Sequence, residues 1–218
     1  MNKLFDLNGP VMVFLAKFAD LIILSTLWFF CSLPIFTIGP ATAALYYVAL
    51  KIVRDEEEVK ISKAFFHGFK TNFKQGVILN LIFMILGVVI FVDYFIMSSV
   101  EGLWGTICSV CFFVMGIWLL CVMFYTYPLQ AQFINPIRST LKNAAFLSAQ
   151  KFATTVMIFL MHMVPVIVAF MSLKIFVLAA PVWVLLLPGL LAYVCSQQLV
   201  KIFDPLIKPA ETKAPEEE

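Results

Sequence analysis

Long apolar runs constrain this chain more than any motif does. Runs of 21 to 25 residues cover 18–38, 77–97, 103–127, 152–172 and 175–197, and a shorter one covers 41–53. As a helix, a run of this length matches a bilayer core roughly 30 Å thick. Only 13% of the 218 residues are charged, whereas a soluble domain carries about 25%. We therefore predict an all-α, polytopic membrane protein with five long transmembrane helices and one short, broken one.

The stretch 32–57 contains a turn between two apolar arms. Pro34, Gly39 and Pro40 interrupt the apolar run, and the second arm ends at a charged cluster that begins with Arg54. At 1.5 Å rise per residue, the second arm covers only about 20 Å, which allows either a short crossing or a re-entrant half-helix. Pro34, Gly39 and Pro40 are candidate functional residues, because discontinuous helices often line substrate sites in transporters.

Basic residues indicate on which side of the membrane each connection lies. Lys and Arg are concentrated in 51–74, 138–151 and 201–213, and the connection 98–102 has none. Because cytoplasmic connections carry the excess of Lys and Arg, we predict that 54–75, 128–151 and the C-terminus are cytoplasmic. With six crossings the N-terminus is cytoplasmic too, and only Lys174 of the fifteen basic residues lies outside. The charge count therefore favours six crossings.

Two cytoplasmic connections have the period of an amphipathic helix. Ile61, Phe65, Phe69 and Phe73 recur at every fourth residue, and lysines lie elsewhere on the same helix. Residues 136–151 repeat this arrangement. We predict interfacial amphipathic helices at both places, with Phe65, Phe69 and Phe73 as candidate interface residues.

The domain organisation follows from these elements. We predict one membrane domain over residues 1–203, built from hairpins at 18–53, 77–127 and 152–197. Residues 204–218 contain three prolines and end in three glutamates, a composition typical of disorder, so we expect a disordered cytoplasmic tail. We expect no cleavable signal peptide, because the first apolar run has no strongly basic region directly before it.

Polar side chains inside the apolar runs are the first candidates for function, because they are costly at membrane depth. Asp93 lies about four residues before the end of its run, where it can either reach the headgroups or serve a substrate or proton. His162 lies near the middle of its run, where it can either bond inside the helix bundle or act as a ligand. Asn80 is expected to bond between helices.

Motifs of the common enzyme classes are missing from the sequence. It contains no phosphate-binding loop, no H-E-x-x-H or G-x-S-x-G motif and no paired carboxylates. Cys108 and Cys111 have C-x-x-C spacing, but no second motif accompanies them, so we interpret the cysteines as small apolar residues. We expect no enzyme activity and no catalytic, cofactor-binding or metal-binding residues. A net charge of +2 does not point to a nucleic-acid partner.

Two segments resemble a known family. Residues 33–56, LPIFTIGPATAALYYVALKIVRDE, are followed by 65–75, FFHGFKTNFKQ. They resemble the YesL family (DUF624) of bacterial integral membrane proteins, which implies a multi-pass protein of the bacterial cytoplasmic membrane. Members of this family often occur beside carbohydrate ABC importers and sensor kinases, so the resemblance implies a role near sugar uptake or sensing. It supplies no catalytic or ligand residues.

Two functional hypotheses follow. The first is an accessory or regulatory subunit in the lipid bilayer, with carbohydrate ABC importer subunits or a sensor kinase as its partner. The second is a small transporter or permease that acts on its own, which the broken segment 32–53 favours. Residues 136–151 lack the glycine and the I-x-L-P end of an importer's coupling segment, so we reject close kinship with importer permeases. The sequence leaves the substrate, the partner and the oligomeric state open.

Overall fold

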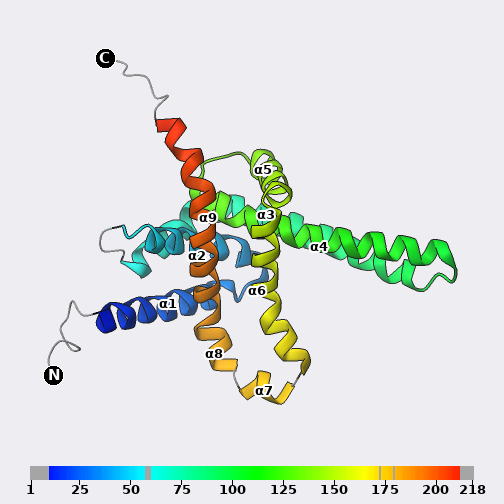
Figure 1. Cartoon of the computed structure of the whole chain (residues 1–218), viewed down its shortest axis with the longest axis horizontal. Helices are drawn as coiled ribbons and strands as arrows, with labels where there is room; N and C mark the ends of the chain where they lie inside the picture. The colour runs from blue at the N-terminus through cyan, green and yellow to red at the C-terminus, as the bar shows by residue number, and fades with distance from the viewer. Residues whose placement is uncertain (1–9, 57–59, 172, 179, 212–218) are drawn as a thin grey trace.

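The structure is a computed structural model that describes residues 10–56, 60–171, 173–178 and 180–211. The described residues form helices joined by short turns, with no strand among them, so the predicted all-α class is confirmed (Figure 1). The elements are α1 (Pro10–Ser32), the 3-10 turn η1 (Ile35–Thr37), α2 (Ile38–Val53), α3 (Ile61–Ser98), α4 (Leu103–Gln132), α5 (Ile137–Gln150), α6 (Phe152–Met171), α7 (Leu173–Leu178), α8 (Ala180–Leu185) and α9 (Leu187–Glu211).

Within the described residues, five segments are long and apolar enough to cross a membrane. They are α1, η1 with α2, α3, α4 and α9. Helices α5 and α6 form a pair bent by 97°, and the count reaches six if this pair is one span. The bend falls at Lys151, where the amphipathic sequence of α5 gives way to the apolar sequence of α6. The predicted polytopic helical architecture is therefore confirmed, but the single long helix predicted over 175–197 is wrong, because α7, α8 and the start of α9 divide this run.

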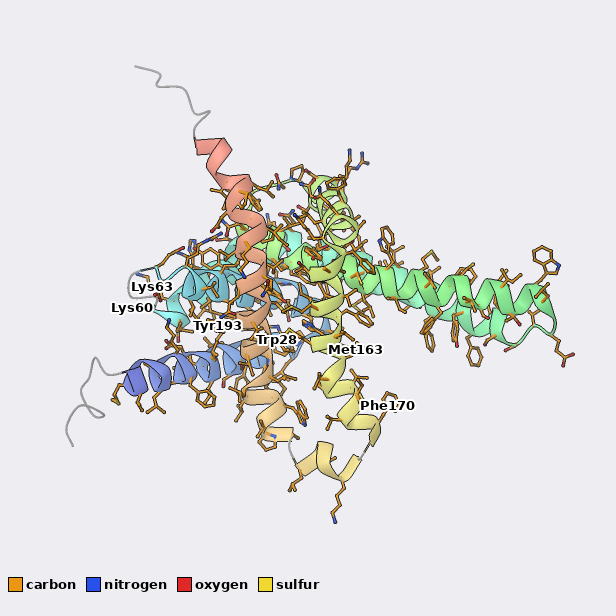
Figure 2. The ribbon with its side chains drawn as sticks, in the orientation of Figure 1. Trp28, Lys60, Lys63, Met163, Phe170 and Tyr193 are labelled. Carbon is orange, nitrogen blue, oxygen red and sulfur yellow. The ribbon has the colours of Figure 1, made fainter. Side chains whose placement is uncertain are left out.

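The helices meet in a central region from which two hairpins extend. Helices α3 and α4 form one long hairpin that projects away from the rest of the chain, and α6 and α9 run across its direction (Figure 1). The side chains of the projecting parts are mainly apolar and exposed, as Figure 2 shows for Phe170 on α6. Exposed apolar side chains of this extent suit contact with lipid.

Helix α2 packs antiparallel to the first half of α3 at very close range. A Cβ atom added at Gly76 would lie 2.7 Å from the nitrogen of Pro40, and one added at Gly68 would lie 3.0 Å from the ring of Tyr47. Gly39 faces the carbonyl of Gly76 just as closely. Small residues let helix backbones approach in this way, so the glycines on this face permit the close packing of α2 on α3.

This packing shows that the prediction of an interfacial helix over residues 61–75 is wrong for its apolar face. The segment forms the first part of α3 and continues directly into the apolar span. Its apolar face packs on the protein instead of lipid: Phe65 is fully buried, Phe69 is partly buried, and Phe73 alone of the three is exposed, at 37%. Residues 136–151 do form a separate amphipathic helix, α5, as predicted.

The predicted disordered tail is also wrong for residues 204–211. Helix α9 continues through them to Glu211, and residues 212–218 lie outside the described part of the chain. The extension begins at Phe203, which is fully buried, and at Asp204, whose carboxylate accepts a bond of 3.0 Å from the Arg54 guanidinium. These tertiary contacts stabilise a helix that the proline-rich composition alone disfavours.

Candidate functional site

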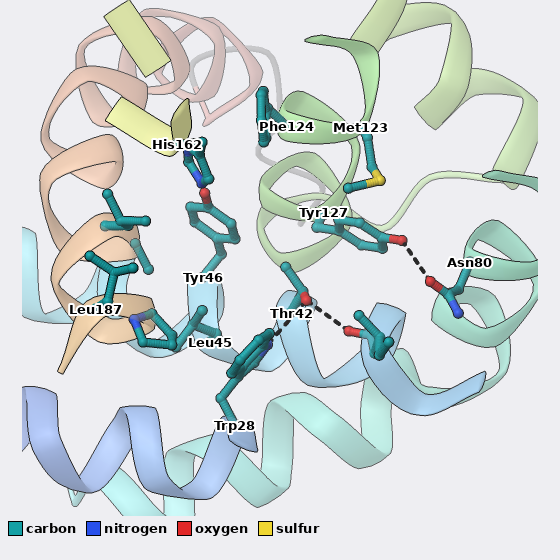
Figure 3. Close-up of a pocket in the computed structure, with 14 residues that line it drawn as sticks. Trp28, Thr42, Leu45, Tyr46, Asn80, Met123, Phe124, Tyr127, His162 and Leu187 are labelled. Atoms are coloured by element: carbon teal, nitrogen blue, oxygen red, sulfur yellow. Dashed lines mark hydrogen bonds between the residues drawn. The ribbon is translucent and has the colours of Figure 1, made fainter. Parts of the chain in front are cut away.

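A cavity of about 310 Å³ lies where α1, α2, α3, α4, α6 and α9 meet (Figure 3). We name it the junction cavity. It lies next to the turn that the sequence singled out, because Ile38 at the start of α2 lines it. Its volume falls at the lower end of the range for small-molecule sites, roughly 300–1,000 Å³. Most of its lining is aliphatic or aromatic, and the side chains with polar atoms are Trp28, Thr42, Tyr46, Asn80, Tyr127 and His162.

Asn80 joins three elements at the wall of the junction cavity. Its Nδ2 donates to the carbonyl of Ile35 in η1 at 2.9 Å, and its Oδ1 accepts from the Tyr127 hydroxyl on α4 at 3.3 Å. Asn80 itself lies on α3 and is 6% exposed. The prediction that Asn80 bonds between helices is confirmed, and the bonds fix the turn against the middle of α3.

A second set of hydrogen bonds ties the two arms of the broken stretch together. The Trp28 indole Nε1 on α1 donates to the Thr42 hydroxyl on α2 at 3.1 Å, and that hydroxyl donates to the carbonyl of Ile38 at 2.7 Å (Figure 3). Both side chains line the junction cavity. Their donor hydrogens are therefore used within the protein.

His162 brings α6 to the junction cavity. Its Nδ1 lies 2.8 Å from the carbonyl oxygen of Ile158, and since a carbonyl only accepts, Nδ1 carries the proton. A charged ring at membrane depth is costly, so the neutral ring is favoured, with Nε2 as an acceptor. The imidazole also lies against the ring of Phe124, with centroids 4.3 Å apart. His162 therefore makes the predicted bond inside the bundle and also lines the cavity.

The chemistry of the junction cavity suits an uncharged ligand. None of the described residues that line it is Asp, Glu, Lys or Arg. Trp28, Thr42 and Tyr127 donate their hydrogens within the protein, whereas His162 Nε2 and the oxygens of Tyr127 and Asn80 retain capacity to accept. Within the described part of the chain, no group of three His, Cys, Asp or Glu side chains could hold a metal ion.

The other predicted site residues lie outside this lining. The carbonyl of Pro34 accepts from the Thr37 hydroxyl at 2.7 Å, which closes the turn. Gly39 and Pro40 are buried against α3, so packing alone accounts for their identity. Asp93 is partly exposed on the α3–α4 hairpin and does not line the junction cavity. A second, apolar groove of about 400 Å³ lies on that hairpin, and Asp93 is not among its lining residues either.

Most residues of the cavity wall escaped the sequence analysis, including several with polar side chains. Trp28, Thr42 and Tyr127 occupy positions where apolar runs commonly contain an aromatic or hydroxyl side chain, so no pattern distinguishes them. Asn80 was the usable signal, because an amide within an apolar run needs a partner from another helix. Pairing Asn80 with a partner required the three-dimensional arrangement.

The fold and the junction cavity define a polytopic α-helical membrane protein with an uncharged internal site. Residues 21–94 match the model of a family described as "Protein of unknown function, DUF624". The resemblance of residues 33–75 to this family is thereby confirmed over residues 21–94, a stretch that includes α2 and the part of α3 that carries Asn80. The chain is also similar to the uncharacterized protein YteU of Bacillus subtilis (strain 168), with 28% identity over 159 residues, covering 68% of this chain and 71% of YteU. No solved structure matches the chain.

Proposed function

We propose that this protein is an accessory or regulatory membrane subunit in bacterial carbohydrate uptake or sensing, and that the junction cavity is its ligand site. The observation that supports the proposal is the uncharged cavity at the junction of six helices. Its wall is mainly aromatic and aliphatic and includes a few hydrogen-bond acceptors. A sugar is uncharged, donates hydrogen bonds through its hydroxyls and presents C–H groups to aromatic rings. The cavity chemistry suits such a ligand better than an ion.

A regulatory role needs a connection between the ligand site and a surface that a partner can contact. Helices α2, α4 and α9 all line the junction cavity, and all three reach one polar cluster near their C-terminal ends. There Arg54 donates to the Gln132 side chain at 2.7 Å and to the Asp204 carboxylate at 3.0 Å. A change in the packing of these helices around a ligand would act on this cluster.

The proposed partners are carbohydrate ABC importer subunits or a sensor kinase. In this proposal the protein lies in the bacterial cytoplasmic membrane with both termini in the cytoplasm, where the polar cluster and α5 are accessible to a partner. It has no enzymatic role. Exposed polar residues of α5, among them Arg138 and Lys142, offer one contact surface.

Two experiments test the proposal. A tagged chain purified from its native membrane in mild detergent should bring down an importer or kinase component, and recovery of neither would refute the partner role. For the ligand site, unfolding temperature is measured with a panel of uncharged mono- and oligosaccharides. We expect one of them to raise the unfolding temperature of the wild-type protein but not that of Ala192→Phe, whose side chain fills the cavity. Failure of every sugar would refute the ligand assignment.

The second candidate function is a small permease that acts alone. The observation that favours it is the position of the junction cavity beside the break between α1 and α2, because broken helices frequently border transport sites. Uptake of a sugar by liposomes that contain only this chain would establish it. Binding of a sugar without any uptake would leave the accessory role as the better assignment.

A further inference from the structure

The first half of α3 carries basic residues on the side opposite its buried face, although the ring of His67 still contacts that of Tyr47 on α2, with centroids 5.9 Å apart. Lys63, His67, Lys70 and Lys74 are all exposed, and their spacing of four, three and four residues places them along one face of a helix. The buried residues of the same segment lie on the opposite face, with Phe65 among them. We name these four residues the basic stripe; Figure 2 labels Lys63 at its start.

The charge of the basic stripe is not compensated within the described part of the chain. The ion pairs that join described residues are Lys17–Asp55, Lys51–Glu56 and Arg54–Asp204, and none of them includes the stripe. The sole acidic residue of α3 is Asp93, which lies about 28 Å beyond Lys74 at 1.5 Å per residue. Because Lys63, Lys70 and Lys74 are exposed, an external anionic partner has access to them.

The surroundings of the basic stripe indicate what kind of partner this is. Phe66 and Phe73 lie beside the lysines and are 45% and 37% exposed. Immediately beyond Lys74, the exposed residues of α3 become apolar, beginning with Ile78 at 46% exposure. Basic and aromatic side chains at the start of an apolar segment are typical of the boundary between headgroups and hydrocarbon. An acidic protein surface would not require this continuity with the lipid-facing part of α3.

Helix α5 extends the same basic surface. The Gln75 amide on α3 donates to the carbonyl of Asn135 at 2.8 Å, which holds the start of α5 beside the end of the basic stripe. The first turns of α5 then expose Arg138 and Lys142. Basic side chains from two helices thus gather at the level where α3 becomes apolar.

We propose that the basic stripe binds the phosphate groups of anionic lipid headgroups, with Phe66 and Phe73 inserted at the edge of the hydrocarbon. Each lysine near a membrane surface favours anionic lipid by about fivefold. The three lysines should therefore enrich anionic lipid around α3 by well over tenfold at low ionic strength. The preference should fall as salt rises, because headgroup and side chains remain in contact with water.

In the Phe66→Trp variant, the fluorescence of the new tryptophan reports on neighbouring lipid, because brominated lipids quench it. The full chain is reconstituted in nanodiscs that contain brominated phosphatidylglycerol or brominated phosphatidylcholine, and the signal of the wild-type tryptophans is subtracted. We expect phosphatidylglycerol to quench at a mole fraction at least fivefold lower than phosphatidylcholine. Lys63→Gln, Lys70→Gln and Lys74→Gln, combined in the Phe66→Trp background, should abolish this preference.

The controls separate charge from position. The same three positions changed to Arg should keep the preference, and Lys201→Gln, which removes an exposed lysine from α9, should leave it unchanged. Equal quenching by both lipids in the Phe66→Trp protein, or a preference that survives the triple Gln variant or 0.5 M salt, would overturn the proposal. If the triple Gln variant does not fold, the salt series decides. A further outcome is that both lipids quench equally and that an acidic protein copurifies with the wild-type protein but not with the triple Gln variant. This outcome would also overturn the proposal and would assign the basic stripe to that protein.

Discussion

The contact between Gly76 and Pro40 predicts a large difference between two glycine-to-alanine substitutions on the same helix. Gly76→Ala would place a Cβ 2.7 Å from the Pro40 nitrogen, 2.8 Å from its Cα and 3.0 Å from its Cδ. All three atoms belong to backbone or to a rigid ring, so no side-chain rotation relieves the clash. Gly87→Ala is the matched control, because nothing lies within 4 Å of a Cβ added there.

The magnitude follows from the distance that α2 has to move. Ordinary contact begins near 3.4 Å, so α2 and α3 must separate by about 0.7 Å at this point. A gap of this size forfeits a quarter to a half of the dispersion attraction across it, and overpacking in a core costs about 1–3 kcal/mol. Both substitutions gain about 1 kcal/mol of helix propensity. We therefore expect Gly76→Ala to be less stable than Gly87→Ala by about 2–3 kcal/mol.

The assay is thermal unfolding in detergent, followed by circular dichroism on both variants and the wild-type protein. A difference of 2–3 kcal/mol corresponds to roughly 5–10 °C in unfolding temperature for a chain of this size. Gly39→Ala, which approaches the same contact from α2, should behave like Gly76→Ala. If Gly76→Ala unfolds at or above the temperature of Gly87→Ala, the close packing of α2 on α3 is refuted.

Three further predictions concern contacts between elements. Arg54→Ala and Asp204→Ala should each cost about 1 kcal/mol, because their ion pair is only partly buried, and unfolding of the double variant should show that the two losses are not additive. Asn80→Ala removes the partner of the buried Tyr127 hydroxyl and should lower the free energy of unfolding by about 1–3 kcal/mol; unchanged stability would contradict the bonding described. Lys17→Cys and Asp55→Cys, in a background without the native cysteines, should be joined by a short bis-maleimide, since the native side chains are 3.2 Å apart; absence of a cross-linked product would contradict the hairpin.

The helical class and most spans could be predicted because run length and charge placement reflect the thickness and polarity of the bilayer. The surroundings of the apolar face of residues 61–75, lipid or protein, could not be predicted. The period of Ile61, Phe65 and Phe69 shows that one side of the segment is apolar, but lipid and a neighbouring helix are equally apolar surroundings. Gly68 and Gly76 on that same side were the available evidence for helix packing, since a lipid-facing surface gains nothing from closely approaching backbones.

The junction cavity could be predicted only in part. The break at Pro34 and the amide of Asn80 both pointed to the correct region, yet six helices contribute to the wall. His162 lies 82 positions after Asn80 in the sequence, and the period of each helix contains no information on how the hairpins cross. The end of α9 escaped prediction for a similar reason: its residue Asp204 accepts a hydrogen bond from Arg54, which is far away in the sequence.

The position of η1 against α3 predicts that the α1–α2 hairpin is re-entrant. Asn80, which bonds to the turn, lies near the midpoint of α3, whereas the exposed apolar part of α3 extends from Ile78 to Ile96, about 28 Å at 1.5 Å per residue. The turn therefore meets α3 where the helix enters its apolar part, not at the far end.

The Lys17–Asp55 ion pair holds both ends of this hairpin on one side, so the distribution of basic residues is satisfied equally well by a re-entrant hairpin and by two full crossings. Leu33→Cys, at an exposed position of the turn, distinguishes them in a background without the native cysteines. An impermeant maleimide added to intact cells should label Glu101→Cys and leave Leu33→Cys unlabelled, while a membrane-permeant maleimide labels both. Labelling of Leu33→Cys by the impermeant reagent would establish two full crossings, because only a turn that reaches the outer aqueous phase is accessible to it.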